Sequence, residues 1–106
     1  MQLTINVDGQ SYPVDVPDDV VAEAHAVFEK MDRDMDGGWQ MSREWVDRPD
    51  TLMRCQIAAD RLLAALERGN RAVVAMMAGY ILTRLPGVTV VRISDDGDMS
   101  TTEFDH

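Results

Sequence analysis

The residues from Arg71 to Leu85 are predicted to form a helix that is apolar on nearly every side. Asn70 is a typical N-cap residue, and Pro86-Gly87 ends the helix. A helix that faces water keeps a polar stripe, so this one is either the central helix of the domain or is covered by a second subunit. Its longest apolar run, Ala72 to Leu82, is far shorter than the roughly 20 residues that a membrane-spanning helix needs, so no membrane association is expected.

Apolar and polar residues alternate on both sides of Asp8-Gly9 near the start of the chain. This pattern predicts two β-strands joined by a two-residue turn. The turn places Ile5 opposite Tyr12 and Thr4 opposite Pro13, which gives the hairpin one apolar face. Because proline has no N–H to donate, the second strand is predicted to lie at the edge of a sheet.

Two further helices are predicted from apolar residues spaced three and four apart. They are a helix that starts at Asp18 or Asp19 and reaches Met31, and a helix that starts after Asp50 or Thr51 and closes at Gly69. The residues between them include a predicted short helix from Ser42 to Val46, which Pro49 stops. These segments supply the apolar faces that would cover the helix at residues 71–85.

The β-branched residues 88–93 read as an interior strand, and residues 99–104 as a short strand that returns after a turn at Asp95–Asp98. Because the second strand is an edge, residues 88–93 are predicted to pair with the first strand, in the spatial order 2-1-3-4. We therefore expect a single α+β domain over residues 1–106, with a small antiparallel sheet packed against about three helices. The helix at residues 71–85 is expected to be central.

The net charge of −9 is unevenly distributed along the chain. Residues 1–47 contain eleven acidic residues against three basic ones, residues 48–94 contain three against seven, and residues 95–106 contain five and none. Nucleic-acid binding needs a clustered positive surface, so no nucleic-acid partner is expected. The basic middle of the chain leaves room for a local anionic partner.

A single cysteine, Cys55, excludes an intramolecular disulfide, and its place among the apolar residues of its helix predicts a buried, unreactive thiol. The N-terminus lacks the pattern of a signal peptide, so a soluble cytoplasmic protein is expected. The sequence contains no nucleophile elbow, phosphate-binding glycine loop or His-Glu-x-x-His motif. We therefore expect a protein that is not an enzyme.

An acidic stretch after the first predicted helix has the composition of a cation-binding loop. Three aspartates stand at alternate positions and are followed by two glycines, a glutamine and a glutamate. Calcium binds about six to eight oxygen atoms, which such a loop can supply. Residues 20–47 resemble an EF-hand with its incoming helix and calcium loop. The resemblance implies Ca²⁺, ahead of Mg²⁺, as the cofactor and the following ligands: Asp32, Asp34, Asp36, Gln40 (directly or through water) and Glu44.

This stretch is one residue longer than an EF-hand loop. Counted from Asp32, Arg43 stands at the twelfth position, where the family has its glutamate, and Glu44 stands at the thirteenth. A bulge at Gly37-Gly38 would absorb the extra residue, since neither glycine restricts φ. The alternative is a solvated polar connection without metal, whose charges are offset by neighbouring basic residues.

Two functions therefore remain open from the sequence. One is a small acidic protein of unassigned role that binds a divalent cation through the EF-hand-like loop. The other is a non-catalytic module for protein–protein interaction or homo-oligomerisation, whose partner is another protein or a second copy docked through the helix at residues 71–85. Arg54, Arg61 and Arg68, seven residues apart on one helix face, are either a docking strip for an acidic partner or a solvated face on which Asp50 pairs with Arg54.

Overall fold

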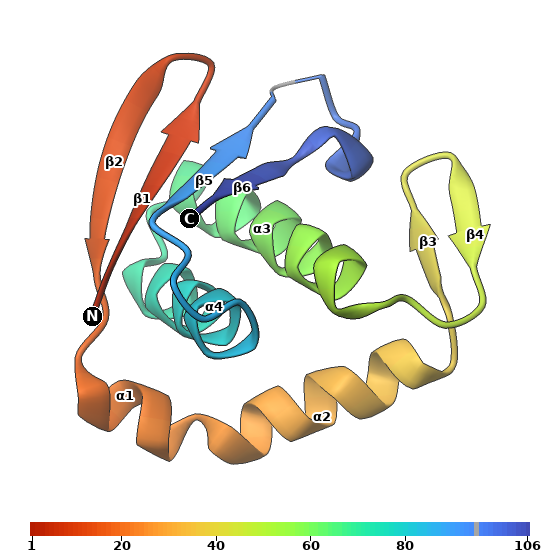
Figure 1. Cartoon of the computed structure of the whole chain (residues 1–106), viewed down its shortest axis with the longest axis horizontal. Helices are drawn as coiled ribbons and strands as arrows, with labels where there is room; N and C mark the ends of the chain where they lie inside the picture. The colour runs from red at the N-terminus through yellow and green to blue at the C-terminus, as the bar shows by residue number, and fades with distance from the viewer. Residues whose placement is uncertain (95) are drawn as a thin grey trace.

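A four-stranded sheet packs against a pair of long helices, which lie between the sheet and two shorter helices (Figure 1). The computed structural model describes residues 1–94 and 96–106. The strands of this sheet, in spatial order, are β2 (Gln10–Asp15), β1 (Gln2–Val7), β5 (Val90–Ile93) and β6 (Glu103–Asp105). The remaining elements are α1 (Asp18–Glu23), α2 (His25–Asp36), β3 (Trp39–Met41), β4 (Glu44–Val46), α3 (Thr51–Glu67), α4 (Arg71–Arg84) and the 3₁₀ helix η1 (Met99–Thr101). The α+β class is confirmed, and the described residues form four α-helices where about three were expected.

The sheet is mixed, so the prediction of a purely antiparallel sheet is wrong. β1 pairs with β5 in parallel, while the pairs β1–β2 and β5–β6 are antiparallel. The helices return the chain to the end of the sheet at which β1 begins, so β5 runs in the same direction as β1 (Figure 1). The order β2-β1-β5-β6 also differs from the expected 2-1-3-4. Two strands that were not predicted, β3 and β4, precede β5 in the chain and form a sheet of their own. Alternation of residues along a strand carries no information about its direction.

The N-terminal hairpin has the predicted register. Ile5 faces Tyr12 and Thr4 faces Pro13, with Asp8 and Gly9 at positive φ in the turn. β2 is an edge strand, as its proline predicts. Leu3 and Ile5 of β1 point to the helices and are fully buried, which fixes the sheet on the core.

The first predicted helix is divided into two helices, α1 and α2, and α2 extends beyond the predicted end at Met31. The helix is interrupted at Ala24, between α1 and α2, and α2 then continues through the acidic stretch to Asp36. No proline or glycine interrupts residues 25–36, so the helix ends only at Gly37. The prediction that Asp32, Asp34 and Asp36 lie in a loop is therefore wrong.

Residues 39–46 form the hairpin β3–β4, so the short helix predicted at residues 42–46 is also wrong. Ser42 turns the chain with a φ of 58°, and its hydroxyl accepts a hydrogen bond from the backbone N–H of Met99 at 2.9 Å. The Trp39 ring lies 5.0 Å from the guanidinium carbon of Arg61 on α3. These two contacts attach the hairpin to η1 and α3.

We expect Gly38→Ala to lower the free energy of unfolding by about 1–3 kcal/mol, measured by urea denaturation. Gly38 has a φ of +100°, and a Cβ there would overlap with Cζ2 of the Trp45 ring. Gly37→Ala is the matched control, because a Cβ at Gly37 meets only the Asp34 carbonyl oxygen at 3.9 Å. Equal destabilisation by the two variants would contradict this account of the hairpin.

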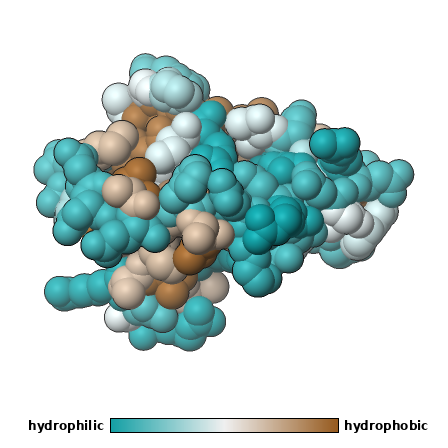
Figure 2. Space-filling model, turned by 90° about the horizontal axis from the view of Figure 1, so that it is seen from below, coloured by the Kyte–Doolittle hydropathy of each residue, from teal (hydrophilic) through white to brown (hydrophobic). Residues whose placement is uncertain are grey.

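α4 is the central helix, as predicted. Its residues Val74 and Met77 to Leu82 are buried, and α3, α1 and β2 pack around it. The same chain therefore covers the apolar face that was a candidate for a subunit interface, and homodimer formation stays a prediction. Seen from the side of α1 and α2, hydrophobic residues form separate patches on the half of the molecule away from β3 and β4 (Figure 2).

The C-terminal segment contains η1 and β6, so its strand is shorter than the predicted strand at residues 99–104. The first residue of the predicted turn, Asp95, lies outside the described residues, and Asp98 caps η1 by accepting a hydrogen bond from the Ser100 N–H at 3.0 Å. None of the helices in the described part of the chain has the length and apolar character needed to cross a membrane.

Candidate functional site

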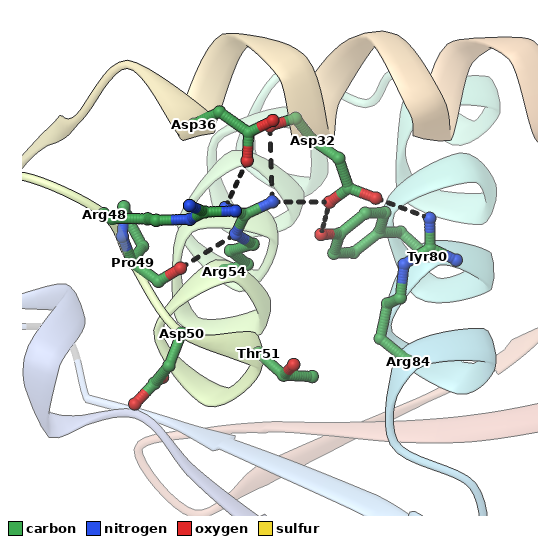
Figure 3. Close-up of a pocket in the computed structure, with 9 residues that line it drawn as sticks. All are labelled: Asp32, Asp36, Arg48, Pro49, Asp50, Thr51, Arg54, Tyr80 and Arg84. Carbon is green, nitrogen blue, oxygen red and sulfur yellow. Dashed lines mark hydrogen bonds and ion pairs between the residues drawn. The ribbon is translucent and has the colours of Figure 1, made fainter.

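A charged pocket of about 370 Å³ lies where the last turns of α2 meet the start of α3 and the end of α4. Figure 3 shows the side chains and the hydrogen bonds and ion pairs between them. The residues that line the pocket are Asp32, Asp36, Arg48, Pro49, Asp50, Thr51, Arg54, Tyr80 and Arg84. The pocket therefore combines two separate stretches of the sequence, residues 32–54 and 80–84, and is open to solvent.

Asp32 is the centre of this network. Its carboxylate accepts hydrogen bonds from the Tyr80 hydroxyl, from Nη2 of Arg84 at 2.8 Å and from Nη1 of Arg54 at 3.4 Å. Tyr80 and Arg84 stand four residues apart on α4 and so face the same side of the helix. One carboxylate thus joins α2 to both α3 and α4.

Arg84 is positioned by aromatic rings as well as by Asp32. Its guanidinium carbon lies 4.8 Å from the centre of the Tyr80 ring and 5.9 Å from that of Phe28. The two rings meet edge to face, with their centres 5.7 Å apart. The guanidinium is therefore fixed on an apolar surface with its edge directed to the pocket.

Arg54 is fixed from several directions. Its Nε donates to the Pro49 carbonyl oxygen at 2.9 Å, its Nη1 also donates to the Asp32 carbonyl oxygen at 3.3 Å, and its Nη2 donates to Oδ1 of Asp36 at 2.7 Å. The predicted pair with Asp50 is not formed, because Asp50 caps α3 by accepting a hydrogen bond from the Met53 N–H at 2.8 Å. Arg54 instead pairs with aspartates on another helix.

The proton affinities follow from this arrangement. Burial would raise the pKa of the Asp32 carboxyl, but hydrogen bonds from Tyr80, Arg84 and Arg54 outweigh burial and bring the pKa below its ordinary value. Burial and the hydrogen bond to Asp32 raise the pKa of Tyr80. Burial also raises the pKa of the neighbouring Cys55 thiol to about 12, and this side chain is buried, as predicted. At neutral pH, Asp32 is thus ionised and Tyr80 protonated.

The structure does not bring the five predicted metal ligands together. Successive helical residues are about 100° apart, so Asp34 points away from Asp32 and pairs instead with Lys30 at 3.0 Å. Gln40 donates its side-chain N–H to the Ser42 carbonyl oxygen at 3.1 Å, and Glu44 is exposed at the start of β4. No group of three or more acidic, histidine or cysteine side chains suited to a metal ion occurs in residues 1–94 and 96–106. Calcium binding stays a prediction.

The predicted arginine strip on α3 is only partly available at the surface. Arg54 turns toward α2, Arg61 lies over Trp39, and Arg68 follows the last residue of the helix. Sequence reasoning missed the pocket residues Arg48 and Arg84. The polar pair Tyr80 and Arg84, one turn apart in an apolar helix, was the one local signal for this site.

No protein-family model matches this chain, and neither a curated protein nor a solved structure was found to resemble it.

Proposed function

We propose that this chain is a non-catalytic binding module that recognises a carboxylate of a partner protein at the pocket around Arg48, Arg54 and Arg84. The carrying observation is that three guanidinium groups line one open pocket and retain donors for a ligand. Arg48 is exposed and forms no ion pair with the described residues, and its side chain extends toward Arg54 (Figure 3). An incoming anion would supply the negatively charged partner that Arg48 lacks among the described residues.

Arg84 has further unused donors. A guanidinium carries five N–H groups, and the hydrogen bonds of Arg84 to Thr83 Oγ1 at 3.2 Å and to Asp32 at 2.8 Å use one N–H each. Its side chain is 27% exposed, so the remaining N–H groups are within reach of a ligand. The planar fork of arginine matches the two oxygens of a carboxylate.

The charge of the surroundings favours a carboxylate over a polyanion. Asp32 and Asp36 already place negative charge in the pocket, and the chain as a whole has a net charge of −9. These charges repel a nucleic acid or a multiply charged phosphate more strongly than a single carboxylate. Small-molecule sites are typically enclosed and mostly apolar, whereas this pocket is open and charged, which favours the surface of a partner protein.

The same geometry supports binding rather than catalysis. The Asp32 carboxylate is occupied by three hydrogen bonds and has a lowered pKa, while the pKa of Tyr80 is raised. Neither group is therefore poised to exchange a proton near neutral pH, as an acid–base catalyst must.

Titration with the peptide acetyl-Gly-Glu-Gly-amide tests the proposal, with the Nε–Hε signals of the arginines followed by NMR. We expect saturable shifts at Arg48, Arg54 and Arg84, with a dissociation constant of about 1 mM at low salt, and none with the glutamine analogue of the peptide. Arg48→Gln should weaken binding about threefold or more, whereas Arg43→Gln, which removes an exposed arginine outside the pocket, should not.

Two results would count against the proposal. The absence of arginine shifts with the glutamate peptide would rule out carboxylate recognition at this pocket. If sodium acetate binds as tightly as the peptide, the pocket recognises a small carboxylate, and the assignment to a partner protein is wrong.

A further inference from the structure

The two carboxylates on Arg54 differ in how they are attached to the protein. Asp32 accepts hydrogen bonds from Tyr80, Arg84 and Arg54, and its side chain is 28% exposed. Asp36 is joined to the described residues by a single ion pair, to Nη2 of Arg54 at 2.7 Å, and its side chain is 49% exposed. Asp32 therefore belongs to the framework of the pocket, whereas Asp36 occupies its surface.

The position of Asp36 in the chain makes its carboxylate easy to displace. It is the last residue of α2, where the negative end of the helix dipole disfavours an acidic side chain. Gly37-Gly38 follows it directly, so the backbone on that side carries no side chain that would restrict its movement. Among the described residues, the ion pair with Arg54 is the one that holds this carboxylate in place.

Arg54 keeps its orientation when Asp36 leaves. The Pro49 carbonyl oxygen accepts from its Nε, and both the carbonyl and the carboxylate of Asp32 accept from its Nη1. These contacts do not involve Nη2, which would remain directed toward the space where the Asp36 carboxylate now lies (Figure 3). A carboxylate from outside would meet a donor that is already in place.

We infer that Asp36 is an internal competitor, a carboxylate of the protein itself that occupies the ligand position on Arg54 and lowers the affinity of the pocket for a partner's carboxylate. The inference rests on the proposed function, since it concerns the regulation of the same pocket. A partner binds by displacing Asp36 from Nη2, and its apparent affinity is the intrinsic affinity multiplied by the fraction of molecules in which Asp36 has left Nη2.

Comparison of Asp36→Asn with Asp34→Asn tests this inference. Both variants remove one negative charge from α2, but Asp34 pairs with Lys30 and does not line the pocket. We expect Asp36→Asn to bind acetyl-Gly-Glu-Gly-amide about three- to tenfold more tightly than the natural chain, and Asp34→Asn to change affinity by less than about twofold. Asp36→Ala, which also lacks an amide oxygen to accept from Arg54, should bind at least as tightly as Asp36→Asn.

The outcomes separate the inference from the proposed function. If the natural chain binds the peptide through Arg48 but neither Asp36 variant binds more tightly, the inference is overturned and the proposed function stands. If Asp34→Asn strengthens binding as much as Asp36→Asn, the effect is general electrostatics, and the inference is again overturned. If neither the natural chain nor any variant binds, both fail. Circular dichroism of each variant shows that the binding data refer to folded protein.

Discussion

Phe28→Ala is expected to lower the free energy of unfolding by about 3–5 kcal/mol, because it leaves a cavity between α2 and α4. The ring is 1% exposed and meets Tyr80 edge to face. It also lies against Gly79, where an added Cβ would be 3.3 Å from the ring's Cζ atom. A single domain is stable by only about 5–15 kcal/mol, so the variant should be close to unfolding. Urea denaturation followed by circular dichroism measures the difference.

Val27→Ala provides the control for this prediction. Val27 precedes Phe28 on the same helix, but it is 40% exposed, so its loss should cost less than about 1 kcal/mol. A cost at Phe28 no larger than that at Val27 would show that α2 is not anchored to α4 through this ring.

Asp32→Asn is expected to lower the free energy of unfolding by about 2–3 kcal/mol, because it leaves Arg84 and Arg54 without a charged partner at a partly buried position. Tyr80 still has an amide oxygen to which it can donate, so the loss arises mainly from the guanidinium groups. The side chain is 28% exposed, which keeps the expected cost below that of a fully buried pair. Asp34→Asn is the control, because the exposed pair of Asp34 with Lys30 contributes only about 0.3–0.5 kcal/mol.

The effect of Asp32→Asn should depend on pH. The pKa of Asp32 in the folded protein lies below its ordinary value of 3.8, so the folded state binds this proton less readily than the unfolded state. The stabilisation is therefore fully present above the unfolded-state pKa and is lost as the pH falls through the folded-state pKa. The difference in unfolding free energy between the natural chain and Asp32→Asn should be constant above about pH 5 and shrink below it. A difference that grows at low pH would contradict the assigned role of Asp32.

The features that sequence reasoning recovered depend on short-range patterns. The alternation around Asp8-Gly9 determines the register of the N-terminal hairpin, and the apolar surface of residues 71–84 requires a central position for α4. Both patterns arise from residues that are neighbours in the chain or on one helix face.

The features that it missed depend on contacts between distant residues. Asp32 and Asp36 lie near the end of a helix, where their charges are unfavourable, and the arginines that offset them stand 18 to 52 residues further along the chain. Without those arginines in view, alternating aspartates before two glycines favoured a calcium loop. The parallel pairing of β1 with β5 was missed for a similar reason, since it depends on the path of the helices between them.

The break at Ala24 gives α2 a degree of independence from the rest of the fold. Its bonds to other backbone groups lie within the helix or at its ends, and side-chain contacts such as those of Phe28 and Asp32 attach it to α4. Such an element can open locally without unpairing the sheet, at a free energy below that of global unfolding. If the pocket binds a carboxylate as proposed, its occupancy and the local opening of α2 are linked equilibria, because both depend on the same contacts between aspartates of α2 and arginines of the neighbouring helices.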